Sequence, residues 1–122
     1  MYSLASISQS LRGLLSGAAD PNVQVTVTYH EVNQITKTDL REYPRAPQFS
    51  SIADTTEVTI LDAPAQVGIF RHVDNITVYN ADNANATVTI FIDDGNNRIL
   101  VSQLLTPSQT MCYEDGMGWF IL

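Results

Sequence analysis

Short apolar runs separated by turn-forming residues dominate the chain from Thr56 onward. In residues 86–92, Val88, Ile90 and Ile92 occupy every second position, which is the period of a strand with one buried face. Asp94-Gly95 follows at once and is a strong signal for a hairpin turn. Comparable runs lie at 23–29, 57–61, 66–73, 75–80, 98–105, 109–114 and 118–122. Strands of this length and spacing predict an all-β fold, either an antiparallel β-sandwich or jelly-roll-like domain or a small barrel.

The first 20 residues follow a different period. Leu4, Ile7, Leu11 and Leu14 recur at spacings of three and four, which is typical of an amphipathic helix. The sequence therefore predicts a short helix over Ser3–Leu15, forming an N-terminal arm of residues 1–20 ahead of a β-domain of residues 21–122. Two roles remain open for the apolar stripe, because it can pack on the sheet of its own domain or dock on a neighbouring subunit.

The strand pattern is lost between about residues 30 and 56. Two prolines interrupt this stretch, and Lys37, Arg41 and Arg45 supply half of the six cations of the chain. A connection of this length inside a small domain is typically functional or unstructured. We therefore expect a long loop at about 30–56, which either reaches beyond its own domain or is merely mobile.

Length and charge restrict the class of protein. The chain has 122 residues, enough for one domain, with 44% hydrophobic and 16% charged residues. Its net charge of −7 argues against binding to nucleic acid or to an anionic membrane, which need a basic surface. The single cysteine, Cys112, lies in an apolar stretch and is expected to be a buried, inert thiol. No signal peptide or membrane span is expected, which places the protein in a reducing cytoplasm or in something assembled there.

Candidate chemistry is sparse. His72 and Asp74 fall on one face of a predicted strand, where a carboxylate can orient a histidine as a base, but no nucleophile motif accompanies them. Asp93-Asp94-Gly95-Asn96 is similar to the start of a calcium loop, yet Leu104 replaces the glutamate at the twelfth position. A surface histidine and a hairpin tip explain both groups. The sequence therefore predicts no enzyme and no catalytic, cofactor or metal site.

A sugar-binding module is a further possibility. Tyr79 or Trp119 can stack on a sugar ring, while Asp82, Asn83 and Asn85 can form hydrogen bonds with it or coordinate a cation. However, Tyr79 lies within a predicted strand, and the apolar run 119–122 is expected to belong to the core.

The last third of the chain combines an Asn-Asp turn, a Thr/Val-rich hairpin and a closing segment that ends in Asp-Gly, Gly and Trp. This order resembles a module of small virion structural proteins of tailed bacteriophages. The residues that carry the resemblance are Ile76–Asp82, Ala86–Gly95, Arg98–Val101, Leu104–Pro107 and Tyr113–Trp119, with weaker similarity at Ser10–Ala18.

The resemblance implies a component of the virion, assembled in the host cytoplasm and bound to the major capsid protein or to other virion proteins. Capsid decoration or cement proteins are the first candidates, and tail or fibre-base subunits are the alternative. Such subunits commonly associate as symmetric homo-oligomers, here a dimer or trimer. The residues expected to contact partners are Leu4, Ile7, Leu11 and Leu14 of the arm, and Lys37, Arg41 and Arg45 of the loop.

Overall fold

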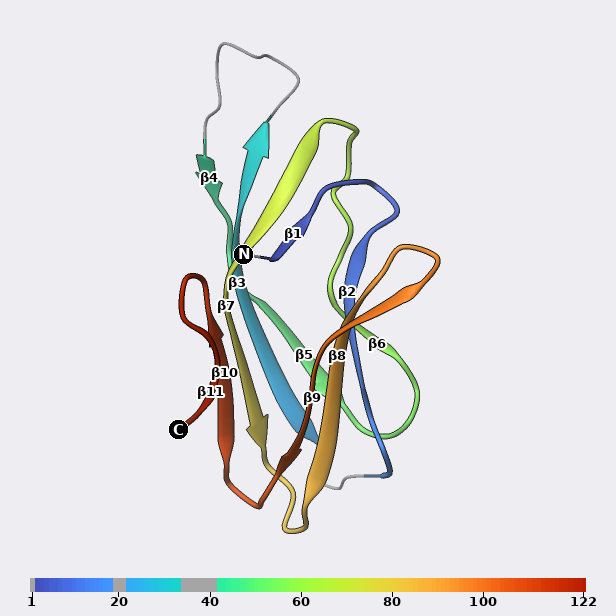
Figure 1. Cartoon of the computed structure of the whole chain (residues 1–122), viewed down its shortest axis with the longest axis vertical. Helices are drawn as coiled ribbons and strands as arrows, with labels where there is room; N and C mark the ends of the chain where they lie inside the picture. Colours follow the sequence, from blue (N-terminus) through green and yellow to red (C-terminus); the bar gives the residue numbers. More distant parts are fainter. Residues whose placement is uncertain (1, 19–21, 34–41) are drawn as a thin grey trace.

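The computed structural model describes residues 2–18, 22–33 and 42–122, and within these ranges all regular secondary structure is β-strand (Figure 1). The strands form two antiparallel sheets, which confirms the predicted all-β class. The small sheet has the order β6-β2-β8-β9, with strands Val58–Leu61 (β6), Ser10–Leu15 (β2), Ala86–Asp93 (β8) and Asn97–Leu105 (β9). The large sheet contains Tyr2–Leu4 (β1), Val23–Asn33 (β3), Glu42–Pro44 (β4), Gln48–Ile52 (β5), Ile69–Asn80 (β7), Thr110–Glu114 (β10) and Gly118–Ile121 (β11).

The large sheet is built around the pairing of β3 with β7. These strands run together from Val23 opposite Asn80 to Asn33 opposite Ile69. The other edge of β7 pairs with β10 along one half and with β1 along the other half. The edge of β3 that faces away from β7 pairs with β5 along one half and with β4 along the other half. All other strands of this sheet therefore pair with β3 or β7, except β11, which pairs with β10.

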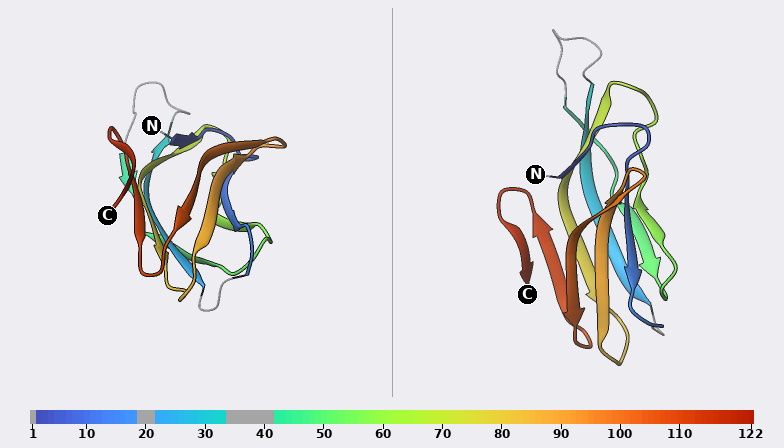
Figure 2. Two further views of the ribbon diagram at one scale, coloured as in Figure 1. Left: turned by 60° about the horizontal axis from the view of Figure 1, so that its bottom comes forward. Right: turned by 45° about the vertical axis from the view of Figure 1, so that its right-hand side comes forward.

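One hydrophobic core lies between the two layers, which face each other in Figure 2. Alternate residues of both sheets point inward, because successive side chains of a strand lie on opposite faces. On one side the sheets are joined, since Ser50 Oγ donates to the Thr59 carbonyl at 3.4 Å and the Leu15 amide donates to the Asp54 carbonyl at 2.9 Å. The fully buried side chains include Val25, Val27, Ile76, Val78 and Met111 of the large sheet and Ile60, Val88, Ile90 and Leu105 of the small sheet.

The predicted N-terminal helix is wrong. Residues 2–4 and 10–15 form strands β1 and β2, and they pair with β7 in one sheet and with β6 and β8 in the other. Within β2, Leu11, Gly13 and Leu15 are buried and alternate with half-buried residues, a period of two. A side chain at Gly13 would place its Cβ 2.7 Å from Cδ1 of Ile52, so the strand approaches β5 closely at a position without a side chain.

The expected loop at 30–56 also contains regular structure. Strand β3 continues to Asn33, and the short strands β4 and β5 both pair with it. Pro44 is accommodated because β4 is the last strand of its sheet, where a missing backbone N–H costs no ladder hydrogen bond. Lys37 and Arg41 lie outside the described residues.

A buried asparagine fixes the turn that follows β7. Asn80 is fully buried, and its Nδ2 donates to the carbonyls of Ala84 at 2.9 Å and Leu105 at 3.0 Å. Its Oδ1 accepts the amide of Asp82 at 3.0 Å. One side chain therefore shapes the Asn-Asp turn and holds the end of the large-sheet strand β7 against the last residue of the small-sheet strand β9.

The stability of the domain tests the strand assignment of the N-terminal segment. Leu11 is fully buried, so Leu11→Ala is expected to lower the free energy of unfolding by about 2–5 kcal/mol. Ile7 lies in the turn between β1 and β2 and is 54% exposed, so Ile7→Ala should change the free energy of unfolding by only about 0.5 kcal/mol. Urea unfolding of both variants provides the measurement. Equal and small effects would mean that the segment is a detachable arm.

Candidate interaction surface

The outer surface of the large sheet carries a row of residues that lie opposite one another on five strands. Phe49 of β5 lies opposite Thr26 of β3, which lies opposite Thr77 of β7. Thr77 lies opposite Cys112 of β10, and Cys112 lies opposite Phe120 of β11. Their chain neighbours on β3, β7 and β10 are buried in the core, so this row points away from it.

A second row runs beside the first and has the same character. It contains Ser51, Gln24, Tyr79 and Thr110, which are again opposite one another across β5, β3, β7 and β10. We call the two rows together the uncharged face, because none of their residues is Asp, Glu, Lys, Arg or His. On β10, the next residue that points to the same side is Glu114, one row further along.

The uncharged face has both a protruding side chain and a hollow. Phe49 is 74% exposed, whereas Thr26, Thr77 and Phe120 are half-buried and Cys112 is only 7% exposed. Next to Phe49 lies a shallow hollow of about 330 Å³ between β3 and β5. Its lining consists of Gln24, Val25, Thr26, Phe49, Ser50 and Ser51.

The small sheet presents a different outer surface. Arg12 of β2 contacts Glu57 at 3.4 Å and Asp93 at 3.6 Å, so ion pairs cross this sheet. Such exposed pairs contribute little to stability, but they keep the surface hydrated. Ion pairs therefore lie on the outer surface of the small sheet, whereas the two rows of the uncharged face contain none.

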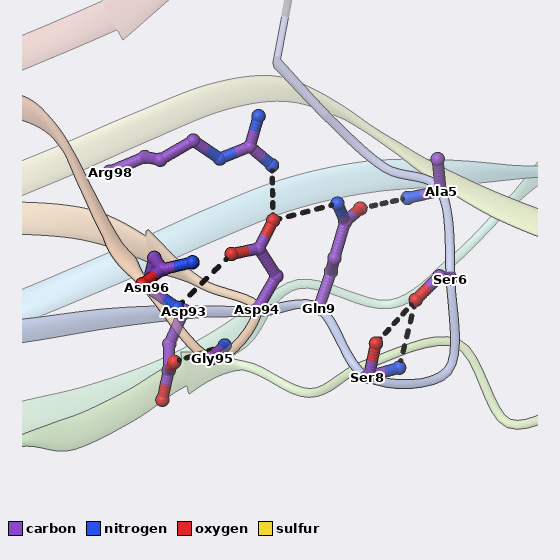
Figure 3. Close-up of polar contacts among 9 residues, drawn as sticks. All are labelled: Ala5, Ser6, Ser8, Gln9, Asp93, Asp94, Gly95, Asn96 and Arg98. Carbon is purple, nitrogen blue, oxygen red and sulfur yellow. Dashed lines mark hydrogen bonds and ion pairs between the residues drawn. The ribbon is translucent and has the colours of Figure 1, made fainter.

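The acidic hairpin tip between β8 and β9 is occupied by internal contacts (Figure 3). Asp93 Oδ1 accepts the amide of Gly95 at 3.0 Å, and Asp94 Oδ1 accepts the amide of Asn96 at 3.3 Å. Asp94 Oδ2 also pairs with Arg98 at 3.0 Å and accepts Nε2 of Gln9 at 3.5 Å, which ties this tip to the turn after β1. Among the described residues no group of three or more His, Cys, Asp or Glu side chains is arranged to hold a metal ion.

The histidines lie close together on the large sheet, although they are distant in sequence. Asp74 is the extra residue of a β-bulge, and its Oδ1 lies 2.8 Å from Nδ1 of His30. Ser3 Oγ lies 2.6 Å from Nδ1 of His72, and the two imidazole rings are 5.2 Å apart. The bulge thus pairs Asp74 with His30. In a catalytic triad one imidazole contacts both the serine and the carboxylate, whereas here Ser3 contacts His72 and Asp74 contacts His30.

Three aromatic side chains pack against one another where β1 meets β10 and β11. The Tyr2 and Tyr113 rings stack with centroids 4.5 Å apart, and Trp119 lies 5.4 Å from Tyr113. Trp119 Nε1 also donates to the Tyr2 hydroxyl at 2.9 Å. Trp119 is therefore committed to contacts within the domain, which does not favour a sugar platform at this position.

The expectation of a buried 119–122 segment is wrong at its end, because Ile121 and Leu122 on the sheet edge are 42% and 75% exposed.

Arg45 belongs to a charge cluster near β4. The carboxylate of Glu31 is buried and pairs with Nε of Arg45 and, at 3.5 Å, with Nε of Arg71. The Arg71 guanidinium also lies over the Tyr29 ring, 5.2 Å from its centroid. Since a buried carboxylate is costly without partners, these contacts have a structural role. The side chain of Arg45 remains 51% exposed.

Among the residues that the structure describes, the predicted partner-binding residues do not lie together. Leu4 and Leu11 are fully buried among side chains of their own domain, which is the packing alternative that the sequence left open. Leu14 is half-buried, and Ile7 and Arg45 are exposed at separate places. The uncharged face was not predicted, although one threonine on each of three strands, Thr26, Thr77 and Thr110, belongs to it.

Comparison with known proteins gives no identification, because no family model, no curated protein and no solved structure matches the chain. Within the described residues, no helix is long and apolar enough to cross a membrane.

Tyr113 gives a test of the core at alkaline pH. Burial, together with the negative charge of Asp115, raises the pKa of Tyr113 above its ordinary value of 10.0. At pH values above 10.0, the Tyr113 hydroxyl loses its proton in the unfolded chain before it does so in the folded chain. The free energy of unfolding should therefore fall as the pH rises from 10.0 through the raised pKa. The Tyr113 hydroxyl also has no hydrogen-bond partner among the described residues. Tyr113→Phe should therefore preserve stability at neutral pH and reduce the alkaline loss, as measured by urea unfolding at several pH values. An unchanged alkaline loss in the variant would contradict this assignment.

Proposed function

We propose that this chain is a non-enzymatic structural subunit of a virus particle, a β-sandwich of the capsid decoration or cement kind. It stabilises an assembly by protein–protein contact. The uncharged face is the observation on which this proposal rests. The sequence resemblance to small virion proteins of tailed bacteriophages supplies the kind of assembly, and the two-layer arrangement of antiparallel sheets is compatible with a sandwich or jelly-roll-like fold.

The composition of the face supports a role in assembly. The cores of protein interfaces are depleted in charged residues and enriched in aromatic ones. Here thirteen acidic and six basic residues are distributed over the chain, and none falls within two rows that cross the large sheet. Phe49 and Phe120 stand at the two ends of one row. A face of this kind fits a protein partner better than a nucleic acid or a charged small molecule.

A tail or fibre-base subunit is the alternative within the same class. The uncharged face suits it equally well, and the two roles differ in the number of copies per particle. A sugar-binding adsorption module needs exposed aromatic rings that are free to stack on a ligand. The Trp119 ring is packed against Tyr113 and hydrogen-bonded to Tyr2, so this candidate stacking residue does not support that function.

The number of copies per particle tests the proposal. Quantitative mass spectrometry of purified particles gives the ratio of this chain to the major capsid protein. We expect a ratio commensurate with the capsid lattice, because a cement subunit binds at every equivalent site of the shell. A few copies per particle would identify a tail or fibre-base component instead. Complete absence from purified particles would contradict a role in the virion.

A further inference from the structure

We infer that the uncharged face binds a second copy of this chain, and that the two copies are related by a two-fold axis. This inference names the partner of the face and rests on its proposed role as an assembly contact. The argument uses the charge distribution of the chain, the hydrogen-bonding groups of the face and its position in the sheet.

Charge distinguishes a second copy from a different partner. Each copy carries a net charge of −7, so two copies repel each other along most approaches. Contact through the uncharged face brings no acidic side chain directly against another. A basic partner, by contrast, is attracted to acidic surface, and a contact region without carboxylates gives it no advantage. The face is therefore best suited to a partner with the same acidic charge as the chain itself.

The side chains of the face can also pair with their own copies. A two-fold interface places the same surface patch on both sides, so each group must tolerate an identical group nearby. The hydroxyls of Thr26, Thr77 and Thr110 and the amide of Gln24 both donate and accept hydrogen bonds. They can therefore satisfy identical partners, whereas like charges in the same positions would repel.

The position of Thr77 defines the centre of such a contact. Its strand, β7, is the middle one of the five strands in the row, and Phe49 and Phe120 lie at the two margins. A two-fold axis at Thr77 that runs along the strands brings Phe49 onto Phe120 of the second copy. In this arrangement aromatic side chains meet at the margins, Thr77 meets Thr77, and each row of the uncharged face meets the same row of the second copy.

The size of the face predicts a weak dimer. Five strands cover about 24 Å, and two rows that lie two residues apart cover about 13 Å along the strands, so the projected area is about 300 Å². A standard interface buries about 800 Å² of accessible surface per partner. The uneven surface around Phe49 adds accessible area, but the contact stays well below that standard size. We therefore expect a dimer that forms reversibly and becomes populated as concentration rises.

Two matched lysine substitutions test the inference in the purified chain. Thr77→Lys places a charge at the centre of the uncharged face, while Thr89→Lys places the same charge on β8, in the interior of the small sheet. Thr89 is half-buried with its hydroxyl 3.0 Å from Ser102 Oγ, so the two positions are comparable. Both variants reduce the net charge from −7 to −6, which by itself favours association. Only their position relative to the contact differs.

Sedimentation velocity over a range of concentrations measures the dissociation constant, and circular dichroism confirms that each variant is folded. We expect the original chain and Thr89→Lys to dimerise alike. Thr77→Lys should raise the dissociation constant by about tenfold or more, because it sets two like charges against each other. A chain that stays monomeric at every concentration would overturn the inference. The same conclusion would follow if the two variants dimerised equally well or were equally impaired.

Salt provides an independent measurement on the unmodified chain. If acidic repulsion opposes dimerisation and the contact is uncharged, added sodium chloride screens the repulsion and lowers the dissociation constant. A rise in the dissociation constant with salt would indicate a contact held by ion pairs and would overturn the inference. These experiments use no virus particles, so their outcome is separate from the copy-number test. A chain found at lattice copy number but monomeric in solution would retain the proposed function and lose only the second-copy partner.

Discussion

The antiparallel pairing of β3 with β7 is the contact on which the other elements depend. It extends from Val23 opposite Asn80 to Asn33 opposite Ile69, and β1, β4, β5 and β10 all attach to one of these two strands. The same pairing provides one wall of the core on its inner side and Thr26 and Thr77 on its outer side. Because strand side chains alternate between faces, a shift of the register by one residue would exchange core and surface along the pair. The fold and the uncharged face therefore share one structural determinant.

The sequence predicted most strands that follow Thr56 well, because their alternation is local and turn residues mark their ends. The apolar runs at 57–61, 86–92, 98–105 and 109–114 correspond closely to strands β6, β8, β9 and β10. The runs expected at 66–73 and 75–80, however, form one strand, β7, which continues through a bulge at Asp74. The N-terminal segment was predicted wrongly, because Leu4, Leu11 and Leu15 fit a helix as well as two strands when only spacing is considered. Their burial between two sheets is decided by pairing with distant strands, with β7 for Leu4 and with β8 for Leu11 and Leu15. No local pattern contains that information.

The uncharged face could not be predicted for a related reason. Phe49, Thr26, Thr77, Cys112 and Phe120 come from five strands, and only the registers between those strands place them in one row. Each of these residues is unremarkable in its own strand. The contact between Asp74 and His30 follows the same rule, since the bulge in β7 turns Asp74 toward a strand 44 residues away in sequence. Local pattern thus predicts elements, whereas the arrangement of their surfaces depends on long-range pairing.

The hydrogen bond between Trp119 and Tyr2 has a consequence for how the chain acquires its structure. It joins residues separated by 117 positions, and Tyr2 also stacks on Tyr113. During synthesis, β1 leaves the ribosome well before β7, its pairing partner, and before the aromatic residues against which it packs. Contacts between distant residues carry a large entropic cost of chain closure and slow the folding reaction. The first strand is therefore expected to be among the last to become ordered, and nascent chains that end before β10 should leave it open to proteolysis.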